Sequence, residues 1–110
     1  MNLVRGTIVL VRFPFTNFEQ AKLRPALIVS SNTFNRGDDL ILAAISSQKS
    51  VHAFASDIEQ KDLMKGILHK KSYIKCGYLL SVEKKLILRV VGILSSKKLK
   101  DVRKKILTIL

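Results

Sequence analysis

An arginine before one apolar stretch and two serines after another are the residues best suited to chemistry. Arg24 directly precedes Pro25–Val29, and Ser46 and Ser47 directly follow Leu40–Ile45. The planar guanidinium of arginine binds phosphate oxygens in pairs and stays charged, and serine hydroxyls can donate to the same group. Because both apolar stretches have the length of strands, the spacing predicts a phosphate-binding site where two strands meet solvent.

Each of these residues also has a purely structural interpretation. Arg24 can form a surface ion pair with Glu19 or Asp39, and such pairs are common. Ser46 and Ser47 can simply turn the chain. The sequence alone leaves these alternatives open.

No group of residues indicates a metal centre. A zinc site needs three or four ligands at characteristic spacing, whereas the chain has one cysteine, Cys76, and two histidines, His52 and His69, that share no ligand spacing. The carboxylates are scattered, and no glycine-rich phosphate loop is present. We therefore expect no metal and no cofactor, and we interpret Cys76 as a small buried residue rather than a nucleophile.

The charge favours a polyanionic partner. Twenty Lys and Arg against eight Asp and Glu give a formal net charge of +12. For a small domain the usual polyanion is nucleic acid. A merely solvated cationic surface, an anionic membrane surface and an acidic protein partner are the alternatives.

The composition predicts one globular domain over residues 1–110, in a reducing compartment. A chain of 110 residues can bury a core without disulfides, and a single cysteine forms no internal disulfide. The apolar run Gly6–Val11 is shorter than the core of a signal peptide, and no run approaches a membrane span. We expect a cytoplasmic protein without membrane contact.

Short apolar runs with few helical patterns predict a mostly β fold, an antiparallel barrel or sandwich. The continuous runs are typical of strands that are buried on both faces. Strands are expected at Thr7–Phe13, Pro25–Val29, Leu40–Ile45, Ser72–Cys76 and Leu86–Val91, with a weaker one at Val51–Ile58, and loops at Pro14–Lys22 and Asn35–Asp39.

The C-terminal segment predicts an amphipathic helix. Ser95 or Ser96 can cap it, because a serine hydroxyl accepts from a free amide of the first turn. Apolar residues follow at helical spacing on one face, and lysines and arginines fill the remainder; the apolar set is Leu99, Val102, Ile106 and Ile109.

The order of several short motifs resembles the MazF/PemK family of toxin endoribonucleases. The matching segments are Arg5-Gly6 before an apolar strand and Pro14, Glu19-Gln20, Arg24-Pro25-Ala-Leu-Ile-Val29, Phe34-Asn35, Ala43-Ala-Ile-Ser-Ser-Gln48 and Ser81-Val82-Glu83. The resemblance extends from about residue 5 to the end of the chain.

This resemblance implies an SH3-like β-barrel that carries helices and forms a homodimer. It also implies metal-independent, sequence-specific cleavage of single-stranded mRNA that leaves a 2′,3′-cyclic phosphate and a 5′-OH, and inhibition by a cognate antitoxin. In the family an arginine and a hydroxyl hold the scissile phosphate, and these match Arg24 and Ser46. The functionally important glutamate matches Glu19.

The chain departs from the family pattern at the general base. Some members have an Arg-Cys-Asp run, and Lys75-Cys76-Gly77 stands there in this chain, so the carboxylate is missing. Others have a histidine where this chain has Phe18. Glu19 is therefore the expected base, with His69 as a distant second.

Four further residues are expected to bind RNA: Lys22, Ser47, Gln48 and Lys75. Two other functions remain open. The barrel can have lost cleavage while it keeps affinity for RNA or antitoxin, which the glycine at position 77 favours slightly. A related barrel fold also serves toxins that act on a topoisomerase, and the pairing of Arg24 with Ser46 argues against this.

Overall fold

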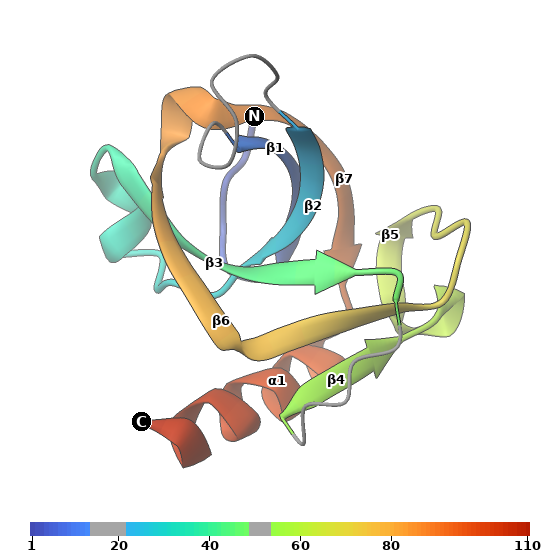
Figure 1. The fold of residues 1–110 in the computed structure, drawn as a ribbon. Helices are drawn as coiled ribbons and strands as arrows, with labels where there is room; N and C mark the ends of the chain where they lie inside the picture. Colours follow the sequence, from blue (N-terminus) through green and yellow to red (C-terminus); the bar gives the residue numbers. More distant parts are fainter. Residues whose placement is uncertain (14–21, 49–53) are drawn as a thin grey trace.

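The computed structural model describes residues 1–13, 22–48 and 54–110. Within these ranges the strands form one antiparallel sheet, in the order β4-β6-β3-β2-β1-β7-β5. The sheet curls into a half-barrel, and helix α1 packs beneath it against β6 and β4 (Figure 1). The elements are β1 Thr7–Phe13, β2 Lys22–Ile28, β3 Asp39–Ser46, β4 Ala55–Ile58, β5 Leu63–Gly66, β6 Ser72–Glu83, β7 Ile87–Leu94 and α1 Ser96–Ile109, with short 3₁₀ turns at Phe34–Arg36, Gln60–Asp62 and Lys84–Leu86.

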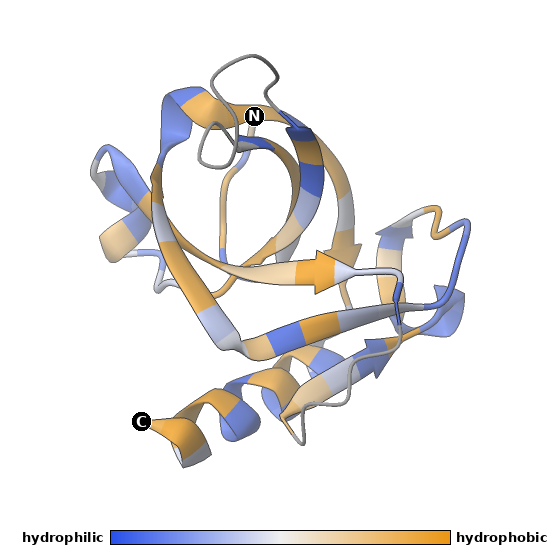
Figure 2. Cartoon of the chain, in the orientation of Figure 1, coloured by the Kyte–Doolittle hydropathy of each residue, from blue (hydrophilic) through white to orange (hydrophobic). Residues whose placement is uncertain are grey.

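Both faces of the central strands are buried, which explains their continuous apolar sequences. One cluster fills the inside of the half-barrel and includes Val9, Val11, Ala26, Ile28, Leu40 and Leu42. The other lies between the sheet and α1 and includes Ile8, Leu27, Ala43, Ile45, Ile74, Val102 and Ile106. Because successive side chains of a strand point to opposite faces, each central strand contributes to both clusters. Figure 2 shows the hydrophobic residues along these strands.

Strand β6 bends sharply and so serves two parts of the sheet. It pairs with β3 at Ala43–Leu79 and again at Ile45–Ile74. One residue of β3 and four residues of β6 lie between these pairs, so β6 carries three extra residues there. The bulge increases the local bend and directs the first half of β6 toward β4 (Figure 1).

A glycine fixes the position of the edge strand β5. Gly66 has φ +100°, and a Cβ at this position would lie 2.5 Å from the carbonyl oxygen of Val91. Only glycine fits such a close approach in this left-handed conformation. Gly66 pairs with Gly92 of β7, so the edge depends on two glycines that face each other.

The predicted helix is confirmed, and Ser95 is its cap. The Ser95 hydroxyl accepts from the Lys98 amide at 3.2 Å. Val102 and Ile106 are buried as expected. Ile109 is instead 41% exposed, because the end of α1 extends beyond the sheet.

The mostly β fold is confirmed. The structure differs from the prediction at the ends of several strands and by one additional strand. Strand β2 begins at Lys22 rather than Pro25, β6 continues to Glu83, and β5 was not predicted. Of the weak strand predicted at Val51–Ile58, the part from Ala55 is confirmed, whereas residues 51–53 lie outside the described ranges. Among the described residues, no helix is both long enough and apolar enough to span a membrane.

Candidate functional site

Arg24 and Ser46 lie two residues beyond the end of the β2–β3 ladder, on the same face of the sheet. The antiparallel ladder between the two strands ends at the pair Ala26–Ala44. Continuing the same register by two residues puts Arg24 opposite Ser46. Pro25 has no N–H to donate, which accounts for the end of the ladder just before Arg24. Arg24 and Ser46 therefore extend from the same end of the β2–β3 ladder, on the face of Ala26 and Ala44.

Arg24 is held by a rigid element and exposed to solvent. It lies opposite Val11 of β1. Strand alternation puts it on the face of Ala26 and Ile28, which belong to the cluster inside the half-barrel. Arg24 itself is exposed, so it lies where this interior opens to solvent. A cation positioned by a strand is better placed for catalysis than one on a free loop.

One of the two carboxylates considered as a partner for Arg24 is too distant. Asp39 begins β3, whereas Ser46 ends it. At about 3.4 Å per residue, seven residues of strand separate them by roughly 24 Å. Asp39 therefore cannot pair with Arg24 of the same chain. Glu19, the other carboxylate, lies outside the described residues.

The hydroxyl of Ser46 has a fixed acceptor role in the turn that ends β3. It accepts a hydrogen bond from the Gln48 amide at 3.1 Å, the pattern of a serine turn. A hydroxyl has one proton and two lone pairs, so this bond leaves the proton for donation to a phosphate oxygen. Ser46 therefore does turn the chain, and the turn also orients its hydroxyl.

The next strand adds an aromatic residue that the sequence did not identify. Tyr73 of β6 lies directly opposite Ser46 and is half-buried. Ser46 and Tyr73 thus lie side by side on β3 and β6, two residues beyond the last β2–β3 pair, as Arg24 does on β2. Lys75 lies two residues further on the same face of β6, and its ammonium is 5.9 Å from the centre of the Tyr78 ring. Only the pairing of β3 with β6 reveals this role of Tyr73.

The remaining predicted RNA-binding residues lie at the ends of the same strands. Lys22 begins β2, opposite Phe13 of β1, and is exposed. Ser47 and Gln48 follow β3 directly and are also exposed. All three therefore lie close to Arg24 or Ser46 along the chain.

A hollow of about 580 Å³ lies on the opposite face of the same strand ends. Pro25 and Ser47 contribute to its wall, next to the two phosphate-binding candidates. His69 and Arg89 also line it. His69 is thus near the site, although on the other side of the sheet from the Arg24 side chain. Arg89 of β7 is a second residue that the sequence did not identify.

Cys76 and Gly77, in the segment that departs from the family pattern, face away from Arg24. Cys76 is 1% exposed, and burial raises the pKa of its thiol, as expected of an inert core cysteine. A Cβ at Gly77 would lie 3.7 Å from Ile109 Cδ1 of α1. A carboxylate at position 77 would therefore point toward the end of the helix rather than toward the Arg24 face of the same chain.

Among residues 1–13, 22–48 and 54–110, no three His, Cys, Asp or Glu side chains gather as metal ligands would.

Several solved structures have the same fold at low sequence identity. A MazE–MazF complex from Deinococcus radiodurans has a TM-score of 0.79 and 16% identity over 97% of this chain and 94% of that chain. An endoribonuclease in complex with its cognate antitoxin from a mycobacterial species has a TM-score of 0.77 and 16% identity, covering 97% and 93%. The Mycobacterium tuberculosis toxin MazF-mt6 has a TM-score of 0.73 and 17% identity, covering 91% of each chain.

Sequence comparison identifies the family. No curated protein sequence matches the chain significantly. The sequence profile of the family described as "PemK-like, MazF-like toxin of type II toxin-antitoxin system" matches residues 4–110, nearly the whole chain. The likeness of fold and the matched residues agree, and the chain belongs to the PemK-like, MazF-like toxin family of type II toxin–antitoxin systems.

Proposed function

We propose that this chain is a metal-independent endoribonuclease that cuts single-stranded mRNA at a short specific sequence and acts as the toxin of a toxin–antitoxin pair. The observation that carries the proposal is the register of β2 and β3, whose last pair Ala26–Ala44 lies two residues from both Arg24 and Ser46. Membership of a toxin family and the net charge of +12 support it. RNA needs no metal here, because its own 2′-hydroxyl can attack the adjacent phosphorus.

In the proposed reaction, a base removes the 2′-OH proton and the oxygen attacks phosphorus. The bond from phosphorus to the 5′-oxygen breaks, and that oxygen takes up a proton. The products are a 2′,3′-cyclic phosphate and a 5′-OH. Arg24 stabilises the negative charge that develops on the phosphate oxygens and hydrogen-bonds the leaving 5′-oxygen, which takes its proton from solvent while Arg24 stays charged.

Ser46 holds a second non-bridging oxygen through the proton that its turn leaves free. Glu19 is the proposed base. Lys22 and Lys75 bind flanking phosphates, and Ser47 and Gln48 contact the nucleotides next to the cut. Tyr73, opposite Ser46 on β6, offers an aromatic face on which an unstacked base can lie.

We further propose that the protein is a cytoplasmic, single-domain homodimer that a cognate antitoxin inhibits. Two of the similar structures are complexes of a toxin with its antitoxin. A small basic toxin that cuts mRNA needs such an inhibitor in the same compartment.

The test incubates the purified protein with a long single-stranded RNA in excess EDTA and maps both ends of each product. We expect discrete cuts with 5′-OH ends. Arg24→Ala should lower the cleavage rate by about 10³-fold, the cost of removing one strong donor to a developing charge. Arg24→Lys should restore little, because an ammonium lacks the paired donors.

Arg12→Ala is the matched control. Arg12 is an exposed arginine of the neighbouring strand β1, opposite Leu23, and the same loss of charge there should leave the cut pattern unchanged. Intact RNA that still binds tightly would contradict cleavage and support a binding barrel instead. Intact RNA without binding would contradict both and direct attention to a protein target.

A further inference from the structure

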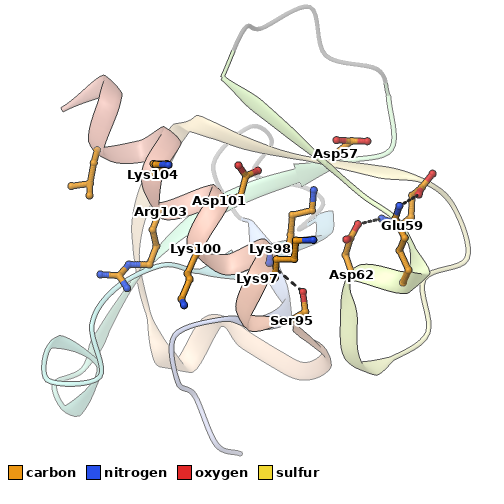
Figure 3. A pocket seen from close by; sticks show the side chains of 12 residues that line it. Asp57, Glu59, Asp62, Ser95, Lys97, Lys98, Lys100, Asp101, Arg103 and Lys104 are labelled. Carbon is orange, nitrogen blue, oxygen red and sulfur yellow. Dashed lines mark hydrogen bonds and ion pairs between the residues drawn. The ribbon is translucent and has the colours of Figure 1, made fainter.

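A large hollow of the described surface lies along α1, and Arg24 is not among the residues that line it. It has a volume of about 1320 Å³ and is lined by charged residues of both signs (Figure 3). Its four carboxylates belong to Asp57, Glu59, Asp62 and Asp101. Its cations come mainly from α1.

Each of the four carboxylates already has an ion-pair or hydrogen-bond partner. Asp57 lies 3.5 Å from the Lys71 ammonium, and Glu59 lies 3.7 Å from that of Lys61. Asp62 accepts from the Glu59 amide at 2.9 Å. Asp101 lies 3.6 Å from the Lys105 ammonium, one turn further along α1, and accepts from a serine hydroxyl of β4. Lysine ammonium groups therefore neutralise three of these carboxylates, and a backbone amide binds the fourth.

The outer cations of α1 have no such partner. Among the described residues, the ion pairs involve Lys61, Lys71, Lys85 and Lys105, and none involves Lys100, Arg103 or Lys104. Figure 3 shows the Lys100 and Arg103 side chains directed away from Asp57 and Glu59. These three residues lie on neighbouring positions of one helix face.

Arg5 joins this face from another element. Gly6 has φ +94°, and a Cβ there would lie 3.0 Å from Leu99 Cδ2 of α1, so the turn before β1 packs directly on the helix. The Arg5 Nε donates to the Val29 carbonyl at 3.2 Å, which holds the guanidinium in place. Partial burial, and then repulsion by Arg103, lower the pKa of Arg5. An anion bound beside both arginines would relieve this repulsion.

We name Arg5, Lys100, Arg103 and Lys104 the α1 basic face. It lies at the opposite end of β1 from the candidate site. Gly6 precedes β1, and Arg24 pairs with Val11 near its other end. Five residues of strand separate the two places by roughly 17 Å.

We propose that the α1 basic face binds the phosphate backbone of the substrate RNA outside the segment that is cut, as a second and sequence-independent contact. This inference rests on the proposed function. Several cations without carboxylate partners, spread over a helix face and an adjacent turn, match a row of phosphates better than a single small anion. Lysine and arginine contacts to phosphates release counterions, which makes such binding depend on salt but not on sequence.

The test compares two double variants that each lower the net charge by two. Lys100→Gln/Arg103→Gln removes half of the α1 basic face, and glutamine preserves the helix. Lys84→Gln/Lys85→Gln is the matched control in the 3₁₀ turn at Lys84–Leu86. Binding is measured by fluorescence anisotropy against single-stranded RNA of 30 and of 4 nucleotides. Both probes are fully 2′-O-methylated so that no cleavage occurs.

For the 30-nucleotide probe, we expect the first variant to weaken binding by roughly 5-fold. The slope of log K against log salt should fall by about 1.4, which corresponds to two lost phosphate contacts on a single strand. The 4-nucleotide probe has three internal phosphates, too few to occupy both surfaces, and its affinity should not change. The control variant should change neither the affinity for the two probes nor the salt slope.

Equal effects of the two double variants would refute the proposal, since the helix cations would then act only through the overall field. A loss of affinity for the 4-nucleotide probe would also refute it, because these cations would belong to the cleavage site. Unchanged RNA binding with weakened binding of polyglutamate would assign the face to an acidic protein segment. If the protein does not cleave RNA in EDTA but the 30-nucleotide probe binds the variant more weakly as expected, the proposed function is refuted and the RNA-binding role of the α1 basic face is supported.

Discussion

The hydroxyl of Ser46 is the group through which the proposed site can be tested most sharply. Ser46→Ala removes the donor to the phosphate, which should lower kcat by about 10²-fold or more, corresponding to at least ~2.7 kcal/mol of transition-state stabilisation. It also removes the acceptor of the Gln48 amide, bonded at 3.1 Å, and should lower the free energy of unfolding by about 1 kcal/mol. Ser46→Thr keeps both hydrogen bonds and restricts the rotamer through its methyl group, so kcat should stay near that of the original protein.

The assay is single-turnover cleavage of a fluorogenic RNA that carries one mapped cut, in EDTA and well below the melting temperature of every variant. Ser96→Ala is the control, because Ser96 is an exposed hydroxyl at the start of α1, outside the proposed site. Because Arg24 and Ser46 act on one phosphate, the double variant Arg24→Ala/Ser46→Ala should lose less than the product of the two single losses. A kcat within threefold of the original for Ser46→Ala would refute the role of this hydroxyl. So would strict multiplicativity with Arg24→Ala.

Three further substitutions test the strands and the helix that support the site. Gly66→Ala should lower the free energy of unfolding by about 2 kcal/mol or more, because its Cβ would meet the Val91 carbonyl oxygen at 2.5 Å. Gly37→Ala is the control, since its Cβ would lie 3.6 Å from its nearest atom, and equal urea midpoints for the two variants would contradict the argument. Ser95→Ala removes the cap of α1 and should cost about 1 kcal/mol in the same measurement; an unchanged midpoint would contradict the assigned cap. Gly77→Asp should leave the cleavage rate nearly unchanged, since its carboxylate would face α1, and a rise of tenfold would show that it reaches the phosphate.

The strands that the sequence predicted correctly are those whose burial is local and continuous. β1 and β3 have apolar residues on both faces, so a run of apolar residues suffices to identify them. β5 could not be identified in this way, because three of its four residues are exposed. It exists because Gly66 and Gly92 allow the backbones of β5 and β7 to approach closely. This is a long-range condition that no local pattern expresses.

The site was predictable only where it depends on local apolar runs of the sequence. Arg24 and Ser46 could be identified because each lies at the end of an apolar strand. Their mutual position depends on the register of β2 and β3, and the role of Tyr73 depends on the pairing of Ser46 with β6. The bulge that interrupts this pairing shifts the register by three residues. Nothing in the sequence around Gly77 predicts how many extra residues the bulge contains.

The two arginine motifs at the start of the chain place positive charge at opposite ends of one hairpin. Arg5-Gly6 lies where β1 begins, and Gly6 packs on Leu99, which sets Arg5 against α1. Arg24-Pro25 lies near the other end of the hairpin, where the missing N–H of proline ends the ladder with β3. In both motifs the arginine provides the charge, and its neighbour fixes the backbone that directs it. The net charge of +12 is thus not spread evenly, because the fold places an arginine of each motif at a different end of the hairpin, and the two proposals together predict that one extended RNA contacts both.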